Sequence, residues 1–272
     1  MADPADAFHH FEHQGWERAA AAYPGTFGEL TAQLAAPLLD AAQISAGARV
    51  LDVATGPGYV AGLAAGRGAR VIGIDFSPAM IAEARVRHPD IDFREGDAEH
   101  LDLPDTSVDA AVMAFGLLHL ARPEAALREL HRVLAPGGRC ALSVWAPPQQ
   151  AIGFGILLDA LAAHGTPAIG LPEGPPFFRF SDPREMRAAL AQAGFAAIEV
   201  TVVPLVWRLT SPDQLFEAAL HGSVRTAALL RAQTPAVLAR IRAVAHDAVA
   251  AYRDGDGYAL PMPAVLASAT RH

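Results

Sequence analysis

A tight turn of small residues directly after an apolar run constrains this chain more than any other feature. The run VLDV, residues 50–53, carries Asp52 and leads into the turn TGPG, residues 55–58; residues 59–66 can then form a helix. Because glycine has no Cβ atom, a ligand can lie against the bare backbone of such a turn, beside the amides that begin the helix. The sequence therefore predicts a strand, a glycine-rich turn and a helix that together form one side of a binding site.

A second buried strand follows, and it ends in an acidic residue. Residues 71–74 (VIGI) are typical of a parallel strand that is buried on both faces, and Asp75 comes directly after them. Ser77 and Pro78 then begin a helix, with proline at a first-turn position that needs no N–H. Asp75 lies roughly twenty residues beyond the glycine turn, where a dinucleotide-binding fold places the carboxylate that accepts both ribose hydroxyls. The alternative is a helix-capping aspartate in an ordinary α/β protein.

A third segment brings further polar residues to the same edge. Phe93 ends a short strand, Gly96-Asp97-Ala98 forms the next turn, and residues 109–114 form another buried strand before Phe115. The carboxyl ends of strands in an open parallel sheet converge on one crevice. We therefore expect Asp52, Asp75, Asp97 and Phe115 to lie on one rim.

These segments together resemble a known family. The motifs LDVATGPG, GIDFSPAMI, GDAEHLDLPDTSVDAAV and, at residues 132–138, RVLAPGG are similar to those of class I S-adenosylmethionine (SAM)-dependent methyltransferases, in the small-molecule and quinone-biosynthesis subgroup. The resemblance covers residues 45–145 well and the remainder weakly. It implies an α/β, Rossmann-like, seven-stranded mixed sheet of order 3-2-1-4-5-7-6, with helices on both faces, a helical lid, and SAM along the carboxyl ends of the strands.

The resemblance also implies which residues contact SAM and its product S-adenosylhomocysteine. Asp97 would accept from the adenine amino group, Ala98 would offer its N–H to the ring, and carbonyls near Ala54 and Gly56 would accept from the methionine ammonium. Tyr23 would close over the methionine part, although a helix-packing role is the alternative. The residues implied as cofactor-binding are Tyr23, Asp52, Ala54, Thr55, Gly56, Pro57, Gly58, Asp75, Phe76, Met80, Asp97, Ala98, Ala114 and Phe115.

A nicotinamide cofactor fits the glycine turn less well. The dinucleotide fingerprint G-x-G-x-x-G is met by Gly56 and Gly58, but Ala61 occupies the third glycine position and Gly62 comes one residue late. The sequence also lacks a second mononucleotide-binding half. A nicotinamide oxidoreductase is therefore disfavoured.

Composition limits which binding partners and which cellular compartment we expect for this chain. A chain of 272 residues with 52% hydrophobic residues fits one domain with insertions, and a formal charge of −8 argues against a nucleic-acid partner. The one cysteine, Cys140, excludes an internal disulfide framework and any CxxC site. No signal peptide and no run long enough to span a membrane is visible, so we expect a cytoplasmic enzyme without a membrane partner, as a monomer or a homodimer.

A metal site is not expected. His9, His10, His13 and Glu12 cluster near the start of the chain, and His9 and His13 are four residues apart. Chain termini usually fray, however, and no apolar scaffold surrounds this cluster.

We expect one methyltransferase domain over residues 1–272, with an N-terminal helical lid (1–44), a SAM-binding core (45–145) and two substrate-lid insertions (146–180 and 211–255). Predicted helices cover residues 11–22, 26–43, 125–134, 153–163, 182–193 and most of 211–252. Later strands are predicted over 139–145, 197–209 and 259–270. The last of these runs antiparallel into the sheet in the resembled family.

The lids are expected to hold the methyl acceptor. Their aromatic residues predict an apolar or aromatic small molecule, whose contacts would include Phe154 and Phe178, with Arg179 and His221 as polar contacts. Generic core packing is the alternative for the aromatic residues. The reaction is an in-line displacement at an activated methyl group, so the protein mainly aligns the acceptor and excludes water. His119 is the candidate base if the O, N or C nucleophile needs one; otherwise it packs or caps a helix.

Three functions remain open at this point. The first is a small-molecule methyltransferase. The second is a SAM-binding enzyme with another reaction, such as a cyclase or decarboxylase, which would leave the cofactor intact after turnover. The third is a non-catalytic SAM-binding module, because the motifs describe binding and not catalysis. The sequence does not identify the acceptor.

Overall fold

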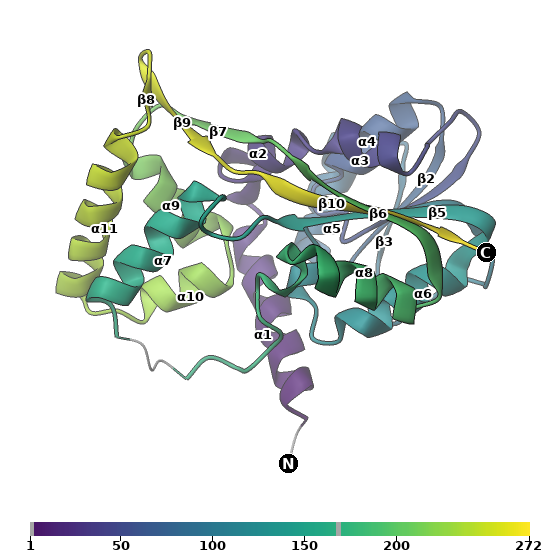
Figure 1. The fold of residues 1–272 in the computed structure, drawn as a ribbon, viewed down its shortest axis with the longest axis horizontal. Helices are drawn as coiled ribbons and strands as arrows, with labels where there is room; N and C mark the ends of the chain where they lie inside the picture. The colour runs from purple at the N-terminus through teal and green to yellow at the C-terminus, as the bar shows by residue number, and fades with distance from the viewer. Residues whose placement is uncertain (1–2, 167–169) are drawn as a thin grey trace.

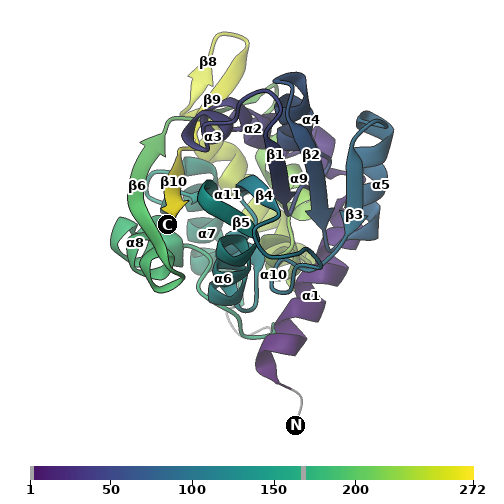
Figure 2. The same cartoon turned by 90° about the vertical axis from the view of Figure 1, so that its right-hand side faces the viewer.

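A seven-stranded sheet of order β3-β2-β1-β4-β5-β10-β6 forms the centre of the computed structural model, which describes residues 3–166 and 170–272. Its strands are β1 (Arg49–Val53), β2 (Arg70–Asp75), β3 (Asp92–Glu95), β4 (Val108–Ala114), β5 (Leu134–Trp145), β6 (Phe195–Val203) and β10 (Ala264–Arg271). Neighbours among β1 to β5 are parallel, and β10 is antiparallel to both β5 and β6. Figure 2 shows these strands from β6 at one edge to β3 at the other. The predicted order is confirmed, with β10 as the seventh strand of this sheet.

Alternation along the central strands fills two apolar layers. In β5, Cys140, Leu142 and Val144 belong to the larger core on one face, whereas Ala141 belongs to the core on the other face. Successive side chains of a strand point to opposite faces, so a strand that is apolar throughout must be covered on both. Burial raises the pKa of the Cys140 thiol to about 12, which keeps it protonated and unreactive.

Helices supply the cover on the two faces. On one face lie α3 (Ala35–Ala41), α4 (Tyr59–Gly66) and α5 (Pro78–Arg87), and on the other lie α6 (Pro123–Val133) and α8 (Pro183–Gln192). Proline at the first turn starts α5, α6 and α8, because its missing N–H would have no partner there. Of these helices, α4 and α5 directly follow strands of the sheet, α3 precedes β1, and α8 precedes β6.

The N-terminal helix begins earlier than predicted. The α1 helix covers Pro4–Ala19, and the Asp3 side chain caps it by accepting from the amide of Ala5 at 3.0 Å. The helix predicted over residues 26–43 is divided into α2 (Gly28–Ala32) and α3, after the short helical turn η1 (Tyr23–Gly25). The expectation of a frayed terminus is therefore wrong for the residues from Pro4 onward.

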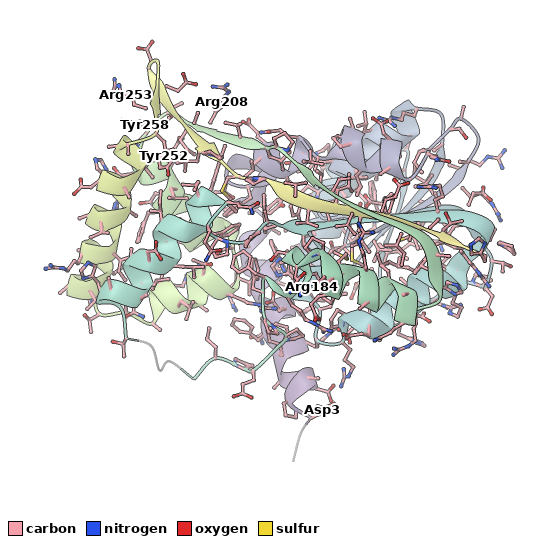
Figure 3. All side chains as sticks on the ribbon, in the orientation of Figure 1. Asp3, Arg184, Arg208, Tyr252, Arg253 and Tyr258 are labelled. Atoms are coloured by element: carbon pink, nitrogen blue, oxygen red, sulfur yellow. The ribbon has the colours of Figure 1, made fainter. Side chains whose placement is uncertain are left out.

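Two predicted strands each turn out to be two strands in different sheets. The residues predicted as one strand, 197–209, are divided by Pro204 into β6 and β7 (Val206–Leu209). The final strand divides near Pro263 into β9 (Gly257–Pro261) and β10, and β7, β9 and β8 (Arg253–Asp254) form a separate three-stranded sheet. Proline cannot donate a ladder hydrogen bond, so it favours a change of sheet at these points. Figure 3 shows Arg208, Arg253 and Tyr258 around the tip of this small sheet.

A layer of helices lies beside the carboxyl ends of the strands. It consists of α7 (Ile152–His164), α9 (Asp213–Gly222), α10 (Arg225–Arg231) and α11 (Pro235–Ala250). Figure 1 shows these helices on one side of the sheet, with α1 running between them and the core. Among the described residues, no helix is both long enough and apolar enough to cross a membrane.

The turn after β1 requires glycine at position 58, and this requirement can be measured. Gly58 caps α4 at φ +81°, and a Cβ atom there would lie 2.9 Å from the Phe93 ring, which also packs against Gly73. Gly137 has a similar φ of +79° but open space around its Cβ position. We expect Gly137→Ala to lower the free energy of unfolding by about 1 kcal/mol through backbone strain. Gly58→Ala should lower it by about 1–3 kcal/mol more through overpacking, as chemical denaturation would measure. Equal losses would show that the Phe93 contact is unimportant.

Candidate functional site

A large cavity lies where the strands β1, β2 and β4 end. Its volume is about 1250 Å³ including the open mouth, and Asp52, Ala54, Asp75 and Ala114 line it from the sheet side. The residues Trp16, Tyr23, Phe177 and Arg225 line it from helices and loops outside the sheet. The cavity thus joins the predicted rim of strand ends to the predicted lids.

The turn after β1 leaves a polar atom without a partner beside the cavity. Asp52 is buried, and its Oδ2 accepts from Thr55 Oγ1 at 2.6 Å and from the amide of Ala61 at 3.0 Å. Its Oδ1 has no hydrogen-bond partner in the part of the chain that the structure describes. Burial raises the pKa of Asp52 to about 7. An added Cβ at Gly56 would meet only open space, so the backbone there is open to a ligand.

Asp75 closes the same turn from the neighbouring strand. Its Oδ2 accepts from the amide of Gly56 at 2.8 Å, and its Oδ1 accepts from the amide of Ser77 at 3.0 Å. The cap of α5 is the Ser77 side chain, which accepts from the amide of Met80, so Asp75 itself is not the helix cap. Burial raises the pKa of Asp75 to about 6, with a smaller effect in the same direction from Glu17. Glu17 of α1 accepts from the amide of Ala79 at 3.1 Å and from Ser77 Oγ.

Two residues that follow strands at the cavity adopt the left-handed backbone conformation. Ala54 after β1 and Phe115 after β4 both have φ +54°, a region that costs residues other than glycine about 1–2 kcal/mol. The Phe115 ring stacks on Trp145 at the end of β5, with ring centroids 4.1 Å apart. Strain held by surrounding packing is common at ligand sites.

The third turn places Asp97 and Ala98 in the cavity wall. Asp97 Oδ1 accepts from the amide of Glu99 at 2.8 Å, and its Oδ2 lies 3.9 Å from His9 Nε2. Phe76 lines the same end of the cavity, and the rings of His9 and His13 stand edge-on to it at 5.7 and 5.3 Å. These histidines thus pack against the cavity wall from α1.

A buried carboxylate joins α1 to His119 and Arg225. Glu12 has no exposed surface; its Oε2 lies 2.9 Å from His119 Nδ1, and its Oε1 accepts from Arg225 Nε at 2.7 Å. His119 and Arg225 both line the cavity. The Trp16 ring stands edge-on to His119 with centroids 4.8 Å apart, so the imidazole is enclosed.

Aromatic side chains form the rest of the wall. Phe154 of α7 lies 5.4 Å from Trp145, 5.8 Å from Phe177 and 6.2 Å from Phe27, measured between ring centroids. All four residues line the cavity. This half of the cavity can hold a flat apolar molecule.

The structure brings most of the predicted cofactor residues together. The cavity lining includes every predicted cofactor residue except Gly58, whose positive φ and contact with Phe93 give it a role in the turn. Tyr23 lines the cavity and is hydrogen-bonded to Thr31 through its hydroxyl at 3.1 Å; burial raises its pKa to about 12.

The structure places one of the four predicted substrate residues in the cavity lining and the other three outside it. Phe154 lines the cavity, whereas Phe178 packs behind Phe154 and Phe177 without lining it. Arg179 is paired with Glu124 at 2.6 Å and Glu185 at 3.2 Å, outside the lining. His221 is exposed and lies 3.4 Å from Glu217. The placement of Arg179 and His221 argues against the direct polar contacts expected of them.

Sequence reasoning missed several residues of the lining. Trp145 is the last residue of the strand predicted over 139–145, so its place at a strand end was detectable by the same rule as that of Phe115. Trp16 and Glu12 are four residues apart on a predicted helix, so they share one face, and this spacing was a weak signal. Nothing in the local sequence marks Phe27 or Arg225, whereas Phe177 is one of the aromatic residues of the predicted lid insertion 146–180.

A mixed, mostly parallel sheet with a large cavity at the carboxyl ends of its parallel strands is typical of the Rossmann-like, cofactor-binding class. The family model described as "Methyltransferase domain" matches residues 51–142. The demethylmenaquinone methyltransferase of Thermus thermophilus is 38% identical over 176 residues, which cover 58% of this chain and 79% of that protein. The chain belongs to the class I SAM-dependent methyltransferases of the quinone-biosynthesis type.

Other similar proteins extend over different shares of the chain. The ubiquinone/menaquinone biosynthesis C-methyltransferase UbiE of Rubrivivax gelatinosus is 36% identical over 164 residues, 56% of this chain and 64% of that protein. For three further demethylmenaquinone methyltransferases the chain spans 44–50% of their length. A Haemonchus contortus phosphoethanolamine N-methyltransferase, solved with S-adenosylhomocysteine, shares the fold with a TM-score of 0.61 at 17% identity, over 97% of this chain and 60% of that one.

The raised pKa of Asp52 predicts how pH changes stability. An unfolded aspartate titrates near pH 3.9, so the folded protein binds more protons between about pH 4 and 7, and the contribution of Asp52 to stability falls as pH rises through this range. In Asp52→Asn, the amide oxygen can accept both bonds of Oδ2. We therefore expect the stability of Asp52→Asn relative to the unmutated protein to rise by about 2 kcal/mol from pH 5 to pH 8 in denaturant titrations.

Asp109→Asn is the matched control for this experiment. The Arg49 guanidinium lowers the pKa of Asp109, so both its folded and unfolded states are ionised across pH 5–8 and its stability difference should stay constant. A constant difference for Asp52→Asn as well would mean that Asp52 stays ionised while buried.

Proposed function

We propose that this enzyme methylates a small hydroxylated aromatic metabolite of quinol type. The observation that carries the proposal is one continuous cavity that joins the strand-end carboxylates to an aromatic wall and to His119. The names of the similar proteins from Thermus thermophilus and Rubrivivax gelatinosus, which refer to quinone substrates, support this acceptor class. A non-methylating reaction on the same cofactor is not favoured by the relatives.

The residues at the strand ends fit SAM. Among the described residues, Asp52 and Asp75 form no ion pair, Asp52 Oδ1 has no hydrogen-bond partner, and the pKa values of both are raised; SAM carries a cationic ammonium and a cationic sulfonium that such carboxylates can bind. The open space at Gly56 allows a ligand to lie against the backbone. Asp75 has lone pairs left for the ribose hydroxyls after it accepts from Gly56 and Ser77.

The remaining contacts follow from position. Among the described residues, the nearest partner of Asp97 Oδ2 is His9 Nε2, at 3.9 Å. This oxygen can therefore accept from the adenine amino group. Ala98 can donate its N–H to the ring. Phe76 and Met80 line this end of the cavity. Tyr23 and Trp16, which stand edge-on at 5.6 Å, close the methionine end.

The chain's own residues then perform three tasks in the reaction. When bound, SAM supplies a methyl group that is already activated by the positive sulfur. The aromatic wall of Phe27, Trp145 and Phe154 holds the acceptor ring, and this contact supplies most of the alignment of the acceptor with the methyl group. The same wall excludes water. His119 takes the proton of an acceptor hydroxyl at Nε2, and this step typically contributes about 10²–10⁴-fold to the rate. An ionised hydroxyl activates both its own oxygen and the ring carbons beside it.

Removal of the Asp75 carboxylate should weaken cofactor binding. Asp75→Ala deletes the acceptor for two ribose hydroxyls, and hydrogen bonds to a charged group contribute about 1.5–3 kcal/mol each. We expect the Kd for S-adenosylhomocysteine to rise well over tenfold in calorimetric titration. Asp92→Ala, an exposed aspartate paired with Arg94 at the other end of β3, should leave the Kd unchanged. An unchanged Kd for Asp75→Ala would remove the ribose assignment.

A panel of acceptors tests the reaction itself. We expect S-adenosylhomocysteine and a methylated product, identified by mass spectrometry, with short-chain naphthoquinols or related phenols and not with aliphatic amines. His119→Ala should lower kcat at least a hundredfold while the Kd for SAM stays within about threefold. His246→Ala, an exposed histidine on α11, is the control. Turnover of amines alone would contradict the acceptor class, and a small loss in His119→Ala would contradict the base role.

A further inference from the structure

The environment of Glu12 is unusual for a residue on an N-terminal helix. Its carboxylate is completely buried, and a buried charge is tolerated only where opposite charge and hydrogen bonds compensate it. Arg225 provides that charge through Nε at 2.7 Å, and His119 Nδ1 lies at 2.9 Å on the other oxygen. Glu12 does not line the cavity, so it can act on the reaction only through its neighbours.

Arg225 is held in place from three directions. Besides Glu12, it donates from Nη1 to the carbonyl of Pro175 at 2.8 Å and from Nη2 to the carbonyl of Leu118 at 2.7 Å. Its guanidinium also lies over the Phe8 ring, 4.4 Å from the centroid. Because Leu118 directly precedes His119, Arg225 holds both the backbone next to the imidazole and the carboxylate that contacts it.

From this arrangement we infer that Glu12 is a positioning residue, which Arg225 holds in place and which holds the His119 proton on Nδ1 so that Nε2 faces the acceptor as a base. The inference rests on the base role of His119 proposed above. A carboxylate can only accept, so the nitrogen that faces it must carry a proton. In a neutral imidazole the other nitrogen is then unprotonated. Nε2 makes no hydrogen bond to the described residues, and His119 lines the cavity.

The proton transfer balances on these groups. The acceptor hydroxyl loses its proton to the Nε2 lone pair and becomes an oxyanion, and His119 becomes an imidazolium with protons on both nitrogens. Glu12 then lies between two cations, and its position next to Nδ1 stabilises the new charge without itself taking a proton. The contacts of Glu12 with His119 and Arg225 therefore stabilise both the neutral Nδ1–H form of His119 and its imidazolium form.

The substitution Glu12→Gln tests this geometry because an amide has only one accepting atom. Arg225 can only donate, so the oxygen of the new amide must turn toward Arg225 and its NH₂ group toward His119 Nδ1. Nδ1 must then accept, and the proton moves to Nε2, where it blocks the base. Nitrogen-15 NMR of the imidazole at pH 8 reports the tautomer in the protein without any ligand. We expect the Nδ1–H form in the unmutated protein and the Nε2–H form in Glu12→Gln.

Asp6→Asn is the matched control. Asp6 is on the same helix and forms an exposed pair with Arg122, so this variant removes a carboxylate from α1 but leaves the buried contacts intact. It should keep the Nδ1–H tautomer and the unmutated kcat. The tautomer of the unmutated protein decides the matter even if Glu12→Gln does not fold: a proton on Nε2 there would overturn the inference.

A double-mutant cycle separates positioning from simple structural support. We expect Glu12→Gln to lower kcat ten- to a hundredfold with an unchanged Kd for S-adenosylhomocysteine, but to change kcat less than twofold when added to His119→Ala. If the two losses multiply, Glu12 acts independently of His119 and the inference is wrong while the base role stands. If His119→Ala alone leaves kcat unchanged, the base role fails, and the positioning role fails with it.

Discussion

The buried Glu12 carboxylate is the contact that brings three separate parts of the chain into one site. It lies on α1, its partner His119 follows β4, and its partner Arg225 begins α10. An unpaired charge in this position would be strongly destabilising, so α1 and α10 must both close on the core before the carboxylate can be buried. The candidate base is therefore completed only in the closed arrangement, which also places Trp16 beside His119 and Glu17 at the start of α5.

The other charges of the site favour a cationic ligand. Besides burial, a neighbouring carboxylate raises the pKa of each strand-end aspartate: Asp75 raises the pKa of Asp52, and Glu17 raises the pKa of Asp75. Without a ligand, burial of Asp52 and Asp75 opposes their ionisation, and backbone amides, the Thr55 hydroxyl and, for Asp75, the nearby His13 compensate part of this cost. A cationic ligand removes part of this penalty, so binding and ionisation of Asp52 should reinforce each other. Part of the binding free energy of a cationic ligand would thus come from carboxylates that destabilise the folded protein when no ligand is bound.

Sequence reasoning predicted the core because its signals are local. Each central strand is a short apolar run that ends in an acidic or small residue, and the glycine turn is defined by neighbours in the chain. The rest depends on distant residues: 107 positions separate Glu12 from His119, and 213 separate it from Arg225. The left-handed conformation of Phe115 depends in the same way on Ser143 and Trp145 of the neighbouring strand. The break at Pro204 was locally visible, but its consequence, a second sheet with β9, required the partner strand.

The same division separates cofactor recognition from acceptor choice. The family match covers residues 51–142, which contain the strand ends around Asp52, Asp75 and Asp97. The aromatic wall comes largely from outside that span, with Phe27 before it and Trp145, Phe154 and Phe177 after it. These rings contact one another, and Trp145 also stacks on Phe115 after β4, so changing one of them alters the shape of this wall. Within the matched span, His119 reaches this wall through Phe177 at 5.7 Å, and Phe115 reaches it through Trp145 at 4.1 Å, measured between ring centroids. Under the proposed function, acceptor preference would vary with the segments outside the matched span, while the proposed base His119 stays next to the end of β4.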